Sequence, residues 1–534
     1  MPLPVPFLPL RERVPTMTEA ADRLFTNAEV HTLTDPDEVH EALAVRNGEI
    51  VRLGDAYEVE FLEGVETDVI DCEGRVVLPG FIDAHTHVEN LGRYLVHADL
   101  SGAESAGECL ERLEARAAET DDGEWIQGFG YDESEWDDAD YLTREDLDRV
   151  SDERPVVALR VDMHAASLNS VALERIAADL PDGDVRKEDG EPTGVVVEDA
   201  AEAVRKGIAP GYEETRDLVT AGLEHAAERG VTAVHDMVRN SEAPRVYRDL
   251  EAEGEGELPT RVRINYWADH LEAVTEVGLA TNAGSDRVRT GAIKTYTDGS
   301  IGARTAKLGE AYADGDGDSD TDGEWVVDPD ELRAIVERAD AEGYQVTAHA
   351  IGDEAIEETI AALEDTDDPA RSRHRIEHVE LATDDHLERM ADAGIVASMQ
   401  PNFHRWAAEG GLYDQRLGEA RRRRTNRLRD VLEAGVPLAF GSDCMPLDPL
   451  LGVHHAVTAP TESQRLSVTE ALRAYTRGAA YAGFDEDRLG TLEVGKRADL
   501  VVLEESPWET DRIDEIDVAN TVVDGEVVFD GREA

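Results

Sequence analysis

The sequence predicts a mixed α/β fold: a (β/α)8 TIM-like barrel inserted in a small β-sandwich, with an extra α+β insertion after barrel strand 1. Two observations carry this prediction. β-rich segments with tight-turn signals occupy both ends of the 534-residue chain. Strand-like and helix-like stretches alternate between these ends, which is the pattern of repeated βαβ units. The two β-rich ends are therefore expected to pair with each other in space.

The sandwich is predicted from residues 22–78 together with residues 488–534. Strands are expected over residues 24–33, 42–46 and 49–53. Asn47-Gly48 separates the last two, and Asp524-Gly525 marks a second tight turn near the C-terminus. Such pairs are strong hairpin signals, because both turn positions need positive φ. Residues 1–21 start with an apolar run broken by prolines, and we expect them to be a disordered arm or a misassigned start.

The barrel is predicted for residues 79–487, and its first strand leads into His85 and His87. Seven further strands are placed by sequence at 231–236, 261–267, 291–296, 344–349, 375–379, 395–400 and 437–440. Amphipathic helical stretches lie between several of them, for example at 330–342, 354–364 and 384–393. The interval between the first two strands is far longer than a βα unit needs. Residues 97–215 are therefore predicted to form a subdomain inserted at the active-site face of the barrel.

Composition narrows the classes of function. The formal net charge of −67 comes from 119 acidic and 52 basic residues, and the acids are spread along the whole chain. Nucleic acid is therefore not an expected partner. Dispersed acidic residues with very few lysines are typical of a halophilic protein, because concentrated salt screens the self-repulsion. The lysines are Lys187, Lys206, Lys294, Lys307 and Lys496.

Cysteine content and hydropathy indicate a cytoplasmic protein. Cys72, Cys109 and Cys444 are too few and too scattered for a disulfide framework or a thiolate metal cluster. No apolar run approaches the ~20 residues that span a bilayer, so no membrane partner is expected. A homodimer is the default expectation for assembly.

Ligand-type side chains follow the predicted barrel strands. His85 and His87 share one face of a strand end because side chains alternate along a strand, and two such imidazoles make half of a metal site. The carboxyl ends of barrel strands converge on one mouth. The six side chains expected to meet there are His85, His87, Lys294, His349, His378 and Asp443.

Each of these residues has an ordinary alternative. A single histidine is more often hydrogen-bonded within a core, and Asp443 could cap the following helix. Lys294 lies in an apolar run of a chain in which arginine has nearly replaced lysine. A buried lysine amine can lose its proton, whereas a guanidinium cannot. Taken together, ligand-type residues at five strand ends make coincidence improbable.

The motifs that carry these residues resemble those of the amidohydrolase superfamily, in particular the branch of N-substituted formamide deformylases and D-aminoacylase relatives. The resemblance runs from about Leu24 to Phe529. It is highly specific for the superfamily and much less specific for a substrate. The motifs are Leu78-Pro-Gly-Phe-Ile-Asp-Ala-His-Thr-His87, Lys294-Thr-Tyr-Thr-Asp-Gly-Ser-Ile-Gly-Ala-Arg304, His349-Ala-Ile-Gly-Asp353, Arg375-Ile-Glu-His378 and Gly441-Ser-Asp443.

The resemblance implies a divalent metal site, with Zn²⁺ as first choice and one or two ions per chain. The histidine pair of strand one and the aspartate of strand eight would hold one ion. The histidines of strands five and six would hold another, and the lysine of strand four would bridge the two as its carbamate. Carried over in that order, these residues are His85, His87, Asp443, His349, His378 and Lys294.

A single-metal site built from the strand-one pair, Asp443 and either His349 or His378 stays open. Iron and manganese also remain open, because imidazole and carboxylate ligands suit all three metals.

The implied reaction is hydrolysis of a non-peptide C–N bond, in a linear or N-substituted small-molecule amide, by metal-activated water. Asp443 is the expected general base, which takes the proton of the water and returns it to the leaving nitrogen. His164, Arg304 and His404 are expected to bind substrate, with a purely structural role as an equal alternative for His164 and Arg304.

Two other functions stay open. A mononuclear metal deaminase of a heterocyclic substrate predicts that Lys294 is dispensable. A scaffold protein that has lost its chemistry predicts a metal-free chain.

Overall fold

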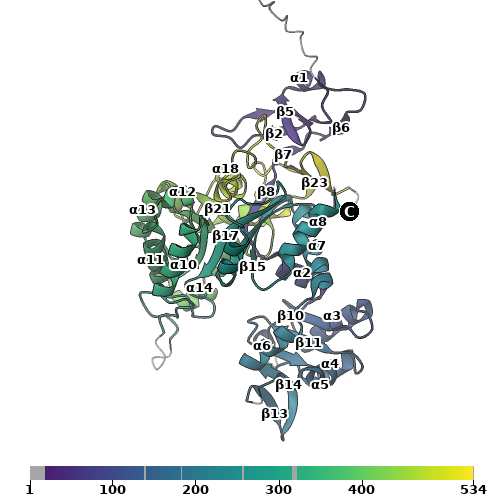
Figure 1. The fold of residues 1–534 in the computed structure, drawn as a ribbon, viewed down its shortest axis with the longest axis vertical. Helices are drawn as coiled ribbons and strands as arrows, with labels where there is room; N and C mark the ends of the chain where they lie inside the picture. Colours follow the sequence, from purple (N-terminus) through teal and green to yellow (C-terminus); the bar gives the residue numbers. More distant parts are fainter. Residues whose placement is uncertain are drawn as a thin grey trace, which may run out of the picture.

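The computed structural model describes residues 19–136, 140–181, 183–254, 256, 258–315 and 321–532. Residues 1–18, which make up most of the predicted arm, lie outside these ranges. A parallel barrel occupies the middle of the molecule, with smaller β-sheets at one end and the inserted α+β unit at the other (Figure 1). The predicted fold class is confirmed.

The barrel sheet has eight strands in the order β21-β20-β19-β18-β17-β16-β15-β8. Successive strands are parallel, as expected when each is followed by a crossover helix. Each strand overlaps its sequence-predicted range. The bounds are β8 Phe81–Thr86, β15 Val231–Val238, β16 Arg261–Trp267, β17 Val288–Tyr296, β18 Val346–Ala350, β19 Arg375–His378, β20 Val396–Met399 and β21 Leu438–Phe440.

The barrel is closed between β21 and β8 by single hydrogen bonds at the ends of the two strands. The Asp443 amide donates to the His85 carbonyl at 2.7 Å. The Asp83 carboxylate accepts from the amides of His85 and Ser442, both at 3.0 Å. Gly441 is required here, because a Cβ on it would lie 2.4 Å from the His85 amide nitrogen. These contacts form a seam between the ends of β21 and β8, and the seam places Asp443 beside His85 and His87.

Helices cover the outside of the barrel (Figure 1). Three of them, α10, α11 and α13, follow barrel strands four, five and six and match the amphipathic stretches expected there to within a few residues. The helix bounds are α2 Val88–Val96, α7 Tyr212–Glu228, α8 Ala243–Glu253, α9 Leu271–Glu276, α10 Pro329–Ala341, α11 Asp353–Glu364, α12 Pro369–Ser372, α13 Asp384–Ala393, α14 Leu412–Leu417, α15 Glu419–Arg422, α16 Leu428–Glu433, α17 Pro449–Thr458, α18 Val468–Arg473 and α19 Ala479–Ala482. A 3₁₀ helix, η3 Pro401–Ala407, and a π-helix, η4 Ala474–Gly478, complete this layer.

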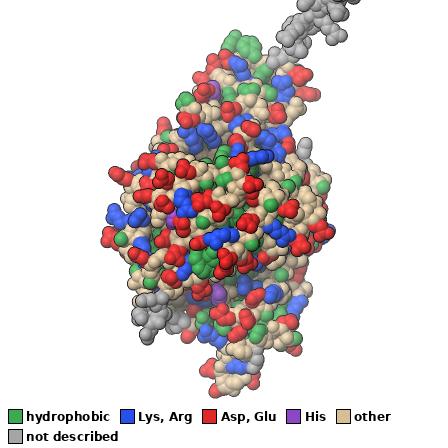
Figure 2. Space-filling view, turned by 60° about the vertical axis from the view of Figure 1, so that its left-hand side comes forward, with side chains coloured by type: hydrophobic (Ala, Val, Ile, Leu, Met, Phe, Trp, Pro, Cys, Tyr) green, Lys and Arg blue, Asp and Glu red, His purple; other side chains and the backbone are tan. Residues whose placement is uncertain are grey.

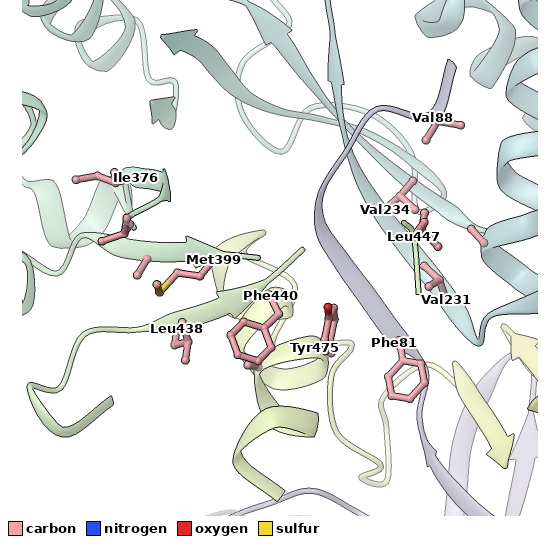
Figure 3. Close-up of a cluster of buried hydrophobic side chains, with 14 of the residues drawn as sticks. Phe81, Val88, Val231, Val234, Ile376, Met399, Leu438, Phe440, Leu447 and Tyr475 are labelled. Carbon is pink, nitrogen blue, oxygen red and sulfur yellow. The ribbon is translucent and has the colours of Figure 1, made fainter. Parts of the chain in front are cut away.

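The main hydrophobic core lies between the barrel strands and these helices (Figure 3). Tyr475 of η4 packs edge-on against Phe440 of β21, with ring centroids 5.2 Å apart, and against Phe81 of β8 at 6.4 Å. β8 and β21 are not paired with each other in the sheet. Large buried side chains therefore hold these two strands together.

The two chain ends form the β-sheets above the barrel. One sheet has the order β5-β4-β1-β6 and the other the order β24-β23-β22-β7-β2-β3. The second sheet pairs β7 with β22, so the N- and C-terminal segments do meet. The bounds are β1 Arg23–Thr26, β2 Glu29–His31, β3 Val39–His40, β4 Ala42–Arg46, β5 Glu49–Gly54, β6 Asp68–Asp71, β7 Val76–Pro79, β22 Leu500–Leu503, β23 Val518–Val523 and β24 Glu526–Asp530, with α1 at Ala56–Glu60.

Both predicted hairpin turns form. Asn47 and Gly48 have φ of 52° and 74°, and Asp524 and Gly525 have φ of 52° and 80°. The single strand expected over residues 24–33 divides instead at Asn27, where φ is 51°. The turn sends its two halves, β1 and β2, into different sheets.

The inserted unit, between α2 and α7, contains a six-stranded sheet in the order β13-β14-β12-β11-β10-β9. It has its own hydrophobic clusters on the two faces of this sheet. The bounds are β9 Ala98–Asp99, α3 Ala106–Glu119, β10 Ile126–Tyr131, α4 Arg144–Val150, β11 Val156–Arg160, β12 Ala165–Leu168, α5 Ser170–Ile176, β13 Val185–Glu188, β14 Glu191–Val197 and α6 Glu198–Gly207.

Acidic side chains are dispersed over the face drawn in Figure 2, with basic side chains (Lys and Arg) scattered among them. Within the described ranges, no helix is both long and apolar enough to cross a membrane.

Candidate metal centre

His85, His87 and Asp443 form a compact cluster at the carboxyl end of the barrel. One potential ligand atom from each lies within 4.8 Å of the others. The Nε2 atoms of His85 and His87 stand 3.5 and 3.3 Å from the same oxygen of Asp443. A nitrogen, nitrogen and oxygen donor set of this kind suits a divalent transition metal.

The other ring nitrogen of each histidine, Nδ1, donates a hydrogen bond within the protein. Nδ1 of His85 donates to the Glu377 carboxylate at 2.7 Å, and Nδ1 of His87 donates to the Met237 carbonyl at 3.2 Å. These bonds fix the tautomer that leaves Nε2 unprotonated and free to ligate. The donor set therefore fits a metal.

His349 and His378 extend the cluster from β18 and β19. Their ring centroids lie 4.4 Å apart, and His378 lies 5.0 Å from His85. Nδ1 of His378 donates to Gln400 at 2.7 Å, which leaves its Nε2 free. Nε2 of His349 donates to the Gly299 carbonyl at 2.9 Å, which leaves Nδ1 as the nitrogen available to a metal.

The environment keeps these imidazoles neutral. Burial lowers the pKa of His349 to about 3, and the nearby Lys294 adds to the effect. Burial also places the pKa of His378 well below its usual value. Neutral rings are the form that binds metal.

Lys294 of β17 is 1% exposed and belongs to the same cluster. Its Nζ lies 5.5 Å from the ring centroid of Tyr296 and 5.9 Å from that of Trp267. Among the described residues, no carboxylate forms an ion pair with it. Burial lowers the pKa of this amine to about 8, although Glu377 and Asp443 oppose the shift.

Asp443 is ionised in this setting. Burial alone would raise the pKa of this carboxyl, but positive charge beside it, on His85 and His87 when they are protonated, holds that pKa far below its usual value. Its backbone is in the left-handed region, with φ of 53°. His378 and Val379 are left-handed too, with φ of 76° and 52°, which is unfavourable for a β-branched residue. Such strain is concentrated at functional sites.

A second layer of buried charge supports the cluster. Arg375 forms an ion pair with Glu377 at 2.7 Å and donates to the Ala84 carbonyl at 2.6 Å. Although burial opposes ionisation, Arg375 and His85 hold the pKa of Glu377 well below its usual range. Sequence reasoning gave neither residue a role. The available signal was two charged residues, two positions apart, within a short buried strand.

The remaining sequence candidates lie in different surroundings. The His164 side chain is 70% exposed and pairs with Glu198 of the inserted unit at 3.2 Å. Arg304 makes two hydrogen bonds to Asp314 at 2.9 and 3.1 Å. His404 is buried in η3, and neither ring nitrogen has a hydrogen-bond partner among the described residues.

Comparison with known proteins agrees with this geometry. The profile described as the amidohydrolase family matches residues 68–529. YtcJ of Bacillus subtilis, named as an amidohydrolase, is 31% identical over 94% of this chain and 98% of its own length. The N-substituted formamide deformylase of Arthrobacter pascens is 28% identical over 95% and 98%.

A solved structure of a metal-dependent hydrolase is similar to this chain as well. The crystal structure of an uncharacterized metal-dependent hydrolase from Pyrococcus furiosus superposes with a TM-score of 0.78 at 32% identity. It covers 91% of this chain and all of its own. The chain therefore belongs to the amidohydrolase family.

Proposed function

We propose that this chain hydrolyses a non-peptide C–N bond in a small linear or N-substituted amide, with water activated by a divalent metal. One observation carries the proposal: the Nε2 atoms of His85 and His87, neither of which bears a proton, both lie near the same carboxylate oxygen of Asp443. The deformylase of Arthrobacter pascens, similar over nearly its whole length, supports an amide as substrate.

A divalent ion held by these residues supplies a Lewis acid that polarises the substrate carbonyl and lowers the pKa of a bound water to ~7. Zn²⁺ is the first choice for the ion.

The chain provides the proton transfers. An ionised Asp443 accepts one proton of the attacking water on its free carboxylate oxygen as the carbon–oxygen bond forms. It then delivers that proton to the leaving nitrogen as the C–N bond breaks, so that an amine and a carboxylic acid result. The depressed pKa of Asp443 keeps it in the proton-accepting form.

Lys294 is proposed to carry a carbamate that bridges two ions. Carbamylation requires attack of a neutral amine on CO₂, and a pKa of about 8 makes the neutral form accessible near neutral pH. The carbamate would turn a buried cation into an anion near His85 and His349. The charge of Lys294 is, after burial, the next cause of the lowered pKa of both histidines.

Elemental analysis tests the proposal on protein purified and kept in concentrated potassium chloride without chelator. Two ions per chain, together with turnover of N-formyl or N-acetyl amides, would support it. Folded protein without any metal would refute it.

A mononuclear deaminase is the second candidate. It is favoured by the fact that, among the described residues, His85, His87 and Asp443 are the one group of three or more His, Cys, Asp or Glu side chains close enough to hold a metal. One ion per chain, ammonia release from a heterocycle and an active Lys294→Met variant would favour this function over amide hydrolysis.

A further inference from the structure

A ladder of buried polar side chains runs down the barrel interior, away from the metal centre. Below His85 and Glu377, Arg375 donates from Nη1 to Nδ1 of His235 at 3.0 Å. Near the amino end of β16, Arg263 donates to the Asp485 carboxylate at 2.7 Å. The ladder is interrupted at one point, between His235 and Arg263.

The two groups on either side of this gap, Nε2 of His235 and Nε of Arg263, are both hydrogen-bond donors. A guanidinium has no acceptor, so Arg375 can only donate, and Nδ1 of His235 must be the unprotonated nitrogen. Nε2 of His235 therefore carries the proton. Arg263 is 3% exposed, and its Nε–H has no hydrogen-bond partner among the described residues.

The two N–H groups border the same small space. A Cβ on Gly483, which follows α19, would lie 2.8 Å from Nε2 of His235 and 2.9 Å from Nε of Arg263. Both residues also line a cavity of about 20 Å³. That is room for one small ion or one water molecule.

The cavity wall carries an excess of positive charge in a chain of net charge −67. Asp499 and Asp524 lie outside the wall and pair with two of its arginines, Arg261 and Arg287. The other three guanidinium groups face only two carboxylates. The charged residues of the wall are Arg261, Arg263, Arg287, Arg289, Arg488, Asp286 and Asp485.

We propose that this cavity binds one chloride ion between the Nε–H of Arg263 and the Nε2–H of His235. An anion accepts both hydrogen bonds and needs no acceptor in return, whereas a water molecule would also have to place two protons of its own. The ion fixes the His235 tautomer that accepts from Arg375, and so completes the ladder beneath the metal centre. Chloride is abundant in the concentrated salt to which the surface composition is suited.

Bromide gives a direct test. Crystals of the metal-loaded protein soaked in potassium bromide should show an anomalous difference peak in contact with Nε of Arg263 and Nε2 of His235. Density at this position without anomalous signal would identify water and overturn the proposal. An empty cavity would overturn it as well.

A solution test uses the full metal-loaded chain. Its thermal midpoint should be higher in potassium chloride than in potassium gluconate at equal potassium concentration. Gly483→Ala, whose methyl group occupies the space between the two donors, should lose this difference. The matched control Gly211→Ala has no atom within 4 Å of the added Cβ and should keep it.

An equal chloride effect in Gly483→Ala and Gly211→Ala would contradict the site, because it would reflect general salt stabilisation. If Gly483→Ala does not fold, the bromide measurement on the unmodified protein decides the question.

Discussion

Glu377 accepts a hydrogen bond from Nδ1 of His85 at 2.7 Å, and the side chains of the two residues are 0% and 1% exposed. One carboxylate oxygen thus fixes the ring orientation of a proposed metal ligand, while Arg375 and Thr347 engage the other oxygen. A buried carboxylate with this many donors remains ionised, which makes His85 a stronger ligand.

Glu377→Gln should therefore weaken metal binding. The amide has no charge to stabilise the ring proton of His85, and loss of such a partner typically costs 10- to 100-fold in metal affinity, roughly. A titration with a metal-buffered competitor measures the change. Glu337→Gln, on the exposed face of α10, is the control. Unchanged affinity in a folded Glu377→Gln protein would show that Glu377 acts only in folding.

Asp443→Asn should separate metal binding from turnover. His85 and His87 remain to hold an ion, but the amide cannot accept the proton of the attacking water. We expect kcat to fall by about 10²- to 10⁴-fold, the usual range for loss of a general base. Kinetics and metal content measured on the same samples check this. Asp511→Asn, at an exposed position, should leave both unchanged. Turnover close to that of the unmodified chain would exclude Asp443 as the base.

Carbamylation of Lys294 predicts a dependence on bicarbonate and pH. Because burial lowers its pKa to about 8, the neutral amine increases as pH rises toward and past that value. Recovery of activity by metal-free protein, after addition of metal and bicarbonate, should accelerate over this interval. The Lys294→Met variant should not recover, whereas Lys206→Met, at an exposed lysine, should behave as the unmodified chain does. Recovery that ignores both bicarbonate and pH would favour the mononuclear site.

The strands and their ligands were predictable because barrel strands end in register. Alternation places His85 and His87 on one face, and a histidine or aspartate follows three other strands. At His378, however, the side chains do not alternate between the two faces of the strand. Its φ of 76° lets Glu377 and His378, which are adjacent, both reach the centre. A backbone exception of this kind has no signal in a single sequence.

The contacts of two candidate substrate residues, Arg304 and His164, could not be predicted from the sequence for a different reason. Arg304 contacts Asp314, and His164 contacts Glu198, through loop and inter-element packing. Such contacts depend on how turns fold back on one another, and neither residue type nor spacing encodes that. The split of one expected strand at Asn27 has the same origin.

Gly441→Ala should destabilise the protein and loosen the metal site together. The added Cβ would lie 2.4 Å from the amide nitrogen of His85 and 2.9 Å from its Cα, and backbone atoms cannot move aside as a flexible side chain could. The seam between β21 and β8 must open, which we expect to cost about 1–3 kcal/mol of unfolding free energy. The same displacement moves His85 away from Asp443, so metal affinity should fall in parallel. Denaturant unfolding and metal titration measure the two effects, with Gly211→Ala as the matched control. A variant that loses stability but binds metal normally would show that the seam does not position His85.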